Sequence, residues 1–169
     1  MLLILEKIED NKLKWNDIVV ASSNAASMGG SQIFLEPNEK MSVKDLFKGI
    51  SMASANDATV AMAEYISGTE EEFVKLMNKK AKEIGMNNTN FTNACGLDDK
   101  NLYTTAKDVA IMSRELIKHD IIKQYTTIWM DTVRNEMETE TNDQCKLMQE
   151  DYLQFVQQIS SREAVTRRF

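Results

Sequence analysis

The chain has 169 residues, of which 43% are hydrophobic, enough for one domain with an ordinary core. A net charge of -6 and a pI near 4.9 disfavour a nucleic-acid partner, because phosphate binding draws on clustered lysine and arginine. The opening apolar run is shorter than the ~7–15 residues of a secretion signal, and no stretch approaches the ~20 apolar residues of a membrane span. We therefore expect a soluble globular protein and no signal peptide in this chain.

The cysteines and the single histidine do not indicate a reactive or metal-binding site. Cys95 and Cys145 are far apart and have no cysteine or histidine partner at metal-ligand spacing, so neither a zinc site nor a disulfide framework is predicted. His119 lies in RELIKHD at the expected end of a helix. We interpret it as a capping residue at the surface rather than as part of a Ser-His-Asp triad.

The first forty residues contain one predicted helix and two predicted strands. The apolar spacing of LLILEKI favours a helix at the start of the chain. DIVVAS and QIFLE then predict short strands, with Gly29 and Gly30 between them and a turn at Pro37 and Asn38. This is the one clearly sheet-like part of the sequence.

Three helices with marked starts follow. An S/T-x-x-D/E capping box occurs three times, which predicts helices that begin near residues 43, 70 and 106. Gly85 is expected to end the second of these helices as a left-handed cap. The three pairs of capping residues are Ser42 and Asp45, Thr69 and Glu72, and Thr105 and Asp108.

Between the last two helices, NNTNFTNACGLDDKNLYTT is rich in Asn, Asp and Thr and predicts an ordered surface connection. Further on, the β-branched and aromatic run YTTIWMDTV is compatible with a strand. Because no glycine follows Gly96 and no proline follows Pro37, we expect no multi-stranded sheet in the C-terminal third.

The segment 134–169 has a different character from the rest of the chain. It begins with an acidic polar stretch and ends with basic residues, and its apolar residues recur at helical spacing. We therefore predict an amphipathic helix in this tail. Its apolar positions are Met148, Tyr152, Phe155, Val156 and Ile159.

The short stretch SANDA, from Ser54, interrupts a helical pattern and allows two interpretations. Ser54 or Asn56 can act as an N-cap that only separates a helix ending near Ala53 from the next one. Alternatively, the break holds a hydroxyl and a carboxamide at the rim of a cleft. There, serine relays a proton and asparagine offers a donor and an acceptor to a substrate amide. These residues alone leave both interpretations open.

The surroundings of SANDA indicate a family. S-x-N is one element of a signature whose other elements are S-x-x-K and K-T-G. The blocks AASMGGSQIFL, SANDA, and GLDD before a Thr-initiated helix occur in the order seen in serine-type D-alanyl-D-alanine carboxypeptidases, the low-molecular-mass penicillin-binding proteins. The chain resembles this family over roughly residues 1–133, which favours the functional interpretation of Ser54 and Asn56.

The resemblance implies an α+β fold like that of β-lactamases and transpeptidases, here mostly its helical lobe with a few short strands. It implies peptidoglycan stem peptides ending in D-Ala-D-Ala as substrates, β-lactams as ligands, an acyl-enzyme mechanism, no metal or organic cofactor, and an extracytoplasmic location in the cell envelope. By the same resemblance, Ser54 helps to shuttle the proton and Asn56 holds the peptide group of the substrate.

Two family motifs do not occur in this sequence. No serine is followed three positions later by lysine, and there is no K-T-G. The resemblance places S-x-x-K a few residues before Met1, so we expect an internal fragment that is inactive as written. The alternatives are a binding module that uses the tail helix, with self-association through the exposed lobe or the tail, and a relative of the β-lactamases.

Overall fold

A computed structural model describes residues 1–128, 130–134 and 146–148 of the chain. Helices predominate among these residues, and the strands are short. In chain order the elements are α1 Leu2–Glu9, β1 Ile18–Val20, α2 Ser23–Ala26, β2 Lys40–Ser42, α3 Val43–Ala53, α4 Asn56–Ser67, α5 Glu70–Glu83, α6 Ala106–Leu116, α7 Ile121–Thr126, β3 Met130–Thr132 and β4 Lys146–Met148.

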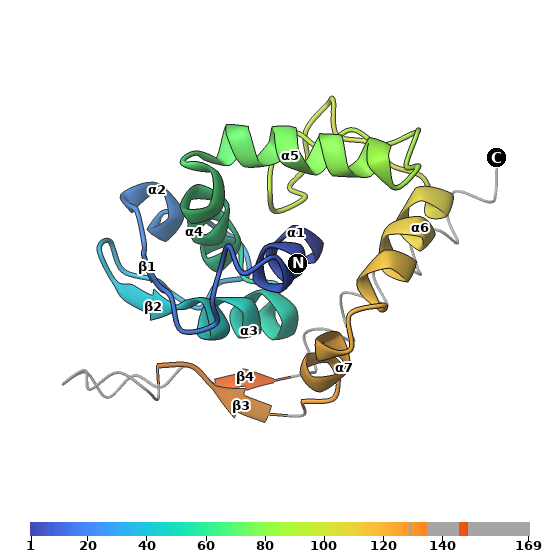
Figure 1. Cartoon of the computed structure of the whole chain (residues 1–169). Coiled ribbons are helices and arrows are strands. Elements are labelled where there is room, and N and C mark those ends of the chain that lie inside the picture. The colour runs from blue at the N-terminus through green and yellow to red at the C-terminus, as the bar shows by residue number, and fades with distance from the viewer. Residues whose placement is uncertain (129, 135–145, 149–169) are drawn as a thin grey trace.

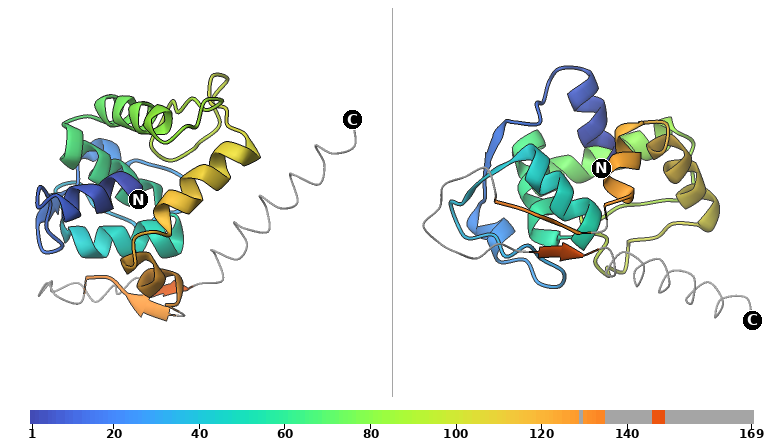
Figure 2. Two further views of the ribbon diagram at one scale, coloured as in Figure 1. Left: turned by 45° about the vertical axis from the view of Figure 1, so that its right-hand side comes forward. Right: turned by 90° about the horizontal axis from the view of Figure 1, so that it is seen from below.

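The helices α1, α3 and α4 lie together at the centre of the molecule, with α5 along one side and α6 and α7 along another (Figures 1 and 2). β1 pairs antiparallel with β2, and Val19 lies opposite Met41. β3 pairs antiparallel with β4 beside α3. The prediction of a mostly helical α+β lobe with a few short strands therefore agrees with the structure.

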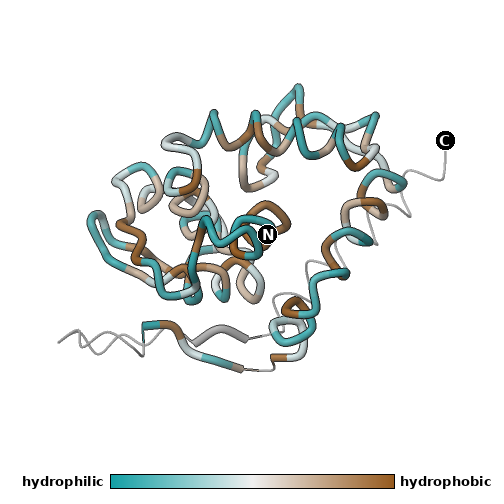
Figure 3. Tube along the Cα trace, viewed as in Figure 1, coloured by the Kyte–Doolittle hydropathy of each residue, from teal (hydrophilic) through white to brown (hydrophobic). Residues whose placement is uncertain are grey.

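The core forms where α3 and α4 meet α1 and the segment that follows α2. Figure 3 shows hydrophobic positions of these helices turned toward one another. Phe47, Val60 and Ile33 are each 0% exposed. Gly49 allows α3 to pack closely against Ile33, since a Cβ on residue 49 would lie only 3.0 Å from the Ile33 side chain. A glycine inside α3 is therefore explained by packing rather than by flexibility.

The capping residues confirm the three predicted helix starts. The hydroxyls of Ser42, Thr69 and Thr105 accept hydrogen bonds from the backbone N–H groups three residues later, at 3.1, 3.2 and 3.1 Å. α3, α5 and α6 begin directly after these residues. Gly85 has φ +89 just beyond the end of α5, as expected for a left-handed cap.

The predicted strand QIFLE is wrong, although DIVVAS does contain β1. Residues 32–36 belong to no strand. The reason is that the N–H groups of Ile33 and Leu35 donate to the carboxylate of Asp57 rather than to a neighbouring strand. The partner of β1 is β2, after the turn in which Asn38 has φ +68.

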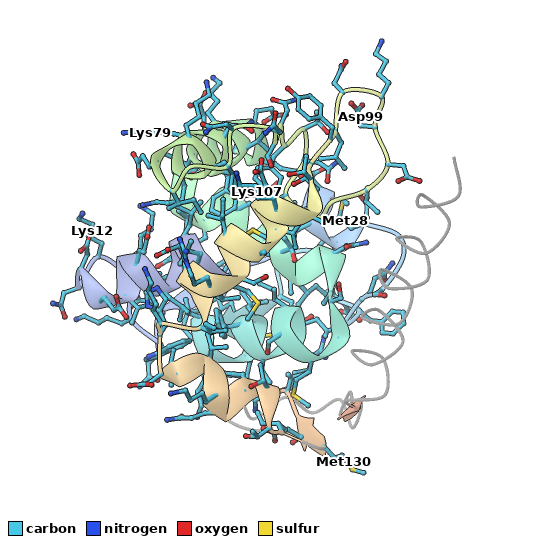
Figure 4. The ribbon with its side chains drawn as sticks, turned by 90° about the vertical axis from the view of Figure 1, so that its right-hand side faces the viewer. Lys12, Met28, Lys79, Asp99, Lys107 and Met130 are labelled. Carbon is cyan, nitrogen blue, oxygen red and sulfur yellow. The ribbon has the colours of Figure 1, made fainter. Side chains whose placement is uncertain are left out.

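The connection between α5 and α6 is ordered by its own polar side chains, as predicted. Asn90 and Tyr103 form an isolated antiparallel bridge. Asp108 in α6 accepts hydrogen bonds from the Asn88 N–H and the Thr89 hydroxyl, both at 2.8 Å. Asp99 lies toward the outer end of this connection (Figure 4).

The structure differs from the sequence prediction at His119 and near the C-terminus. The His119 ring does not cap α6, because its Nδ1 lies 2.6 Å from Oε1 of Glu9 in α1. The run YTTIWMDTV contains the end of α7 and then β3. Met148, assigned to the tail helix, is the last residue of β4, so this part of the chain does contribute a two-stranded sheet. The rest of the predicted tail helix lies outside the described residues.

None of the helices among the described residues combines the length and the apolar character that crossing a membrane requires. Among the same residues, His, Cys, Asp and Glu side chains form no group of three or more that is suited to hold a metal ion.

Candidate active site

The SANDA stretch forms the break between α3 and α4. α3 ends at Ala53, and Ser54 adopts a left-handed conformation with φ 51 and ψ 38. Ala55 is the N-cap of α4, and no side chain supplies a capping hydrogen bond there. Neither Ser54 nor Asn56 therefore acts as an N-cap by its side chain, so that part of the capping interpretation is wrong, although the preceding helix does end at Ala53 as it predicted.

Ser54 presents its side chain to solvent at this break. Within the described part of the chain, its hydroxyl takes part in no hydrogen bond. A left-handed backbone is uncommon for a residue other than glycine, and such conformations persist where the surroundings hold them. The backbone therefore holds Ser54 at the break, and its hydroxyl has both its donor and its acceptor capacity available.

Asn56 is anchored by its backbone and by its side chain. It is 8% exposed, and its backbone N–H donates to the carbonyl of Ser31 at 2.8 Å. The side-chain Nδ2 donates to the carbonyl of Gly29, also at 2.8 Å. Among the described residues, Oδ1 has no hydrogen-bond partner. The carboxamide is therefore oriented from one side and retains an acceptor on the other.

Gly30 makes the close contact with Asn56 possible. Its φ of +84 favours glycine, and a Cβ at this position would lie 2.8 Å from Nδ2 of Asn56. The glycine pair was interpreted from the sequence as an interruption between strands. The structure shows that one of the pair, Gly30, also makes room for Asn56.

Asp57 is the residue of this site to which sequence reasoning assigned no role. Its side chain is 1% exposed and accepts from the N–H groups of Ile33 at 3.2 Å, Leu35 at 3.0 Å and Ala58 at 2.8 Å. Its position in the first turn of α4 also suits a negative charge. The sequence signal was the Asp in SANDA itself, but two of its partners, Ile33 and Leu35, lie more than twenty residues away.

Cys95 lies next to the site but is not a candidate nucleophile. Its Sγ lies 3.5 Å from the carbonyl oxygen of Asn56. Burial, together with the negative charges of Glu70 and Asp57, raises the pKa of the thiol to about 12. The thiol therefore stays protonated near neutral pH, and only a thiolate attacks efficiently. Cys145 lies outside the described residues.

A separate apolar pocket of about 120 Å³ lies among α1, α4 and α5. Its lining is mostly aliphatic, sulfur-containing and aromatic, and it includes neither Ser54 nor Asn56. Representative lining residues are Leu2, Met62, Phe73, Met77 and Phe91. The pocket therefore does not belong to the SANDA site.

A family model described as D-alanyl-D-alanine carboxypeptidase matches residues 1–159. The chain belongs to this family. D-alanyl-D-alanine carboxypeptidase DacF of Bacillus subtilis is 57% identical over 134 residues, which cover 79% of this chain and 34% of the relative. DacC of Escherichia coli is 39% identical over 126 residues, covering 71% of this chain and 31% of the relative. The chain spans about a third of the length of these relatives.

The solved structures place the fold of this carboxypeptidase-family chain among the penicillin-binding proteins, with the transpeptidase/β-lactamase-like fold predicted above. Penicillin-binding protein 5 of Haemophilus influenzae has a TM-score of 0.78 and 31% identity, over 92% of this chain and 44% of that one. Penicillin-binding protein D2 of Listeria monocytogenes, solved in an ampicillin-bound form, has a TM-score of 0.70 and 26% identity, over 87% and 57%.

Proposed function

We propose that this chain supplies the S-x-N part of a carboxypeptidase site for peptidoglycan stem peptides that end in D-Ala-D-Ala. The observation that carries the proposal is the geometry of the break between α3 and α4. It combines an exposed hydroxyl on Ser54 with a carboxamide on Asn56 that donates to the Gly29 carbonyl, while the backbone N–H of Asn56 donates to the Ser31 carbonyl. Membership of the carboxypeptidase family supports this substrate class.

Each side chain has a distinct role in the proposed reaction. The Ser54 hydroxyl can accept a proton and donate one in the same step, so it suits a relay between a general base and the leaving amine. Asn56 has a free Oδ1 and a second hydrogen on Nδ2, which match the N–H and the carbonyl of a peptide group. β-Lactams are proposed as ligands of the same site. The proposed location is the cell envelope.

Acylation needs an attacking oxygen, and the 169 residues contain neither S-x-x-K nor K-T-G. We therefore propose that these residues alone form no acyl-enzyme. Incubation of the 169-residue chain with a fluorescent penicillin is expected to leave it unlabelled on a denaturing gel, whereas intact DacF of Bacillus subtilis serves as the labelled control. Stable covalent labelling of the chain would contradict this part of the proposal.

The roles of Ser54 and Asn56 are tested in a chimera in which residues 1–133 replace the aligned segment of DacF. The chimera is expected to release D-alanine from a pentapeptide. Ser54→Ala is expected to lower kcat/KM by about 10²–10⁴, the range of a lost proton-transfer group. Asn56→Ala is expected to lower it by about 10²–10³, as for a lost polar contact to the reacting group.

The matched control is Ser51→Ala, because the Ser51 hydroxyl only donates to the Lys48 carbonyl within α3. This variant is expected to keep the kcat/KM of the chimera. If Ser54→Ala and Ser51→Ala have equal activities, the proposed relay is wrong. If Asn56→Ala keeps full activity, the proposed peptide contact is wrong.

A further inference from the structure

We propose that Asp57 is the positioning residue of the candidate site: it holds the segment 29–35 in the position that fixes the carboxamide of Asn56. This inference rests on the proposed function of Asn56. Asp57 itself is buried behind the segment and is not assigned a contact with substrate.

Backbone groups of four residues in the segment are hydrogen-bonded to the two neighbouring residues Asn56 and Asp57. The carbonyls of Gly29 and Ser31 accept from Asn56. Two and four residues further on, the N–H groups of Ile33 and Leu35 donate to Asp57. The first turn of α4 therefore binds backbone groups of the segment at four positions, from Gly29 to Leu35.

The segment is also held from a second direction. Arg134 donates from Nη2 to the carbonyls of Ile33 and Phe34, each at 3.1 Å, and its Nε lies 2.7 Å from Oε1 of Glu39. Phe34 has φ +57 and is 71% exposed. A bulky residue adopts this conformation when its surroundings impose it, so the shape of the segment depends on bonds such as those to Asp57.

This arrangement transmits any shift of the segment to Asn56. The side chain of Asn56 takes its orientation from the Gly29 carbonyl, at one end of the segment that Asp57 holds at the other. Gly30 leaves no free space beside Nδ2, since even an added Cβ would lie 2.8 Å away. A small displacement of residues 29–31 therefore either breaks the hydrogen bond to the carboxamide or pushes the carboxamide away.

The test uses the full 169-residue chain and two NMR readouts. The first is the side-chain amide resonance of Asn56, and the second is hydrogen exchange of the Ile33 and Leu35 amides. Asp57→Asn places an NH₂ group against backbone N–H donors. It is expected to shift the Asn56 resonance and to raise the exchange rates about 10- to 100-fold, as for the loss of hydrogen bonds to a charged group.

The matched control is Asp108→Asn, which removes another 1%-exposed carboxylate from the first turn of a helix. Asp108 receives hydrogen bonds from Asn88 and Thr89, outside the segment 29–35. This variant is expected to leave the Asn56 resonance in place even where it lowers the melting temperature. If both variants move the Asn56 resonance equally, the role of Asp57 is general stability and the inference is overturned.

If Asp57→Asn does not fold, a second variant tests whether the segment 29–35 controls the position of Asn56. Gly30→Ala is expected to shift the Asn56 resonance. Gly68→Ala, at a φ of +85 with nothing within 4 Å of the added Cβ, is expected not to do so. An unmoved Asn56 resonance in Gly30→Ala overturns the inference.

Activity of the chimera separates the two proposals. If Asn56→Ala lowers kcat/KM but Asp57→Asn changes neither kcat/KM nor the Asn56 resonance, the positioning role fails and the proposed function stands. If Asp57→Asn shifts the Asn56 resonance while Asn56→Ala keeps full activity, the proposed function fails. In that case the coupling of Asp57 to Asn56 within the fold is still supported.

Discussion

Lys48 is a buried cation that joins α3 to β3. Its Nζ lies 2.9 Å from Oδ2 of Asp131 and donates to the carbonyl of Thr132 at 2.9 Å, while Asp45 lies 3.7 Å away. Burial raises the pKa of Asp131, but hydrogen bonds from Lys48 and the Thr132 backbone lower it more. The net pKa lies below its ordinary value. Asp131 therefore stabilises the fold in its charged form.

The sign of this effect sets the pH at which it is lost. Since the folded pKa of Asp131 is depressed, its contribution is complete above the unfolded pKa of about 3.9 and disappears as pH falls through the folded value. Asp131→Asn is expected to lower the free energy of unfolding by about 1 kcal/mol or less at pH 7, because the side chain is 37% exposed. Urea unfolding at pH 7 and at pH 3 measures the difference.

The difference between the wild type and Asp131→Asn is expected to be smaller at pH 3 than at pH 7. Asp120→Asn is the control, because Asp120 pairs with Lys123 at the surface and its side chain is 89% exposed. This variant is expected to change the free energy of unfolding little at either pH. A difference between wild type and Asp131→Asn that is the same at both pH values would refute the assignment.

Single residues show how far sequence reasoning reaches into the site. Ser54 and Asn56 were predicted from a family motif, and the structure brings them together at a helix break. The role of Asp57 was not predicted, because it depends on contacts with Ile33 and Leu35 that only the tertiary fold creates.

At the scale of elements, the helix starts were predicted correctly because they depend on neighbouring residues. The hydrogen-bond partners of the segment QIFLE were not, because they lie far away in the sequence. The capping hydroxyl of Thr69 and the N–H of Glu72 that it binds are three positions apart, so a short stretch of sequence is enough to predict where α5 begins. For QIFLE, apolar alternation indicated a strand. Its N–H donors had a buried carboxylate available instead. Periodicity reports burial and does not identify the hydrogen-bond partner.

The cap of α5 gives a prediction at this scale. Thr69→Ala removes the acceptor for the Glu72 N–H and is expected to lower the free energy of unfolding by about 1 kcal/mol. Thr69→Ser keeps the hydroxyl and serves as the control, and it is expected to retain the free energy of unfolding of the wild type because serine is at least as good an N-cap as threonine. Urea titrations followed by circular dichroism measure both. Equal losses in the two variants would show that the methyl group, rather than the cap, stabilises this helix.

At the scale of the whole molecule, an aromatic cluster joins three distant parts of the chain. The ring of Phe47 in α3 makes edge-to-face contacts with Trp15 and with Tyr125 in α7. The distances between ring centroids are 5.4 Å to Trp15 and 4.9 Å to Tyr125. Burial, together with the nearby charges of Asp45 and Asp131, raises the pKa of Tyr125 to about 12. The cluster therefore requires the neutral phenol.

This cluster predicts a loss of stability in alkali. The folded pKa of Tyr125 is raised, so its contribution is complete below the unfolded pKa of about 10 and is lost as pH rises toward 12. Between these values the wild type is expected to lose up to about 2 kcal/mol more than Tyr125→Phe. Thermal melts at pH 9 and pH 11 measure this, and Tyr103→Phe, at an exposed ring, is expected to behave as wild type. Parallel decline of wild type and Tyr125→Phe would exclude the phenol as the cause.

Cys95 gives the candidate site a chemical reporter of its own. The thiol lies against the Asn56 backbone, is partly buried and is protonated at neutral pH. Alkylation at this sulfur is therefore expected to be slow while the connection that carries Cys95 stays packed against α4. The rate at which a thiol reagent modifies Cys95, identified by peptide mass, then counts how often the corner beside Asn56 opens, without any label being added to the protein.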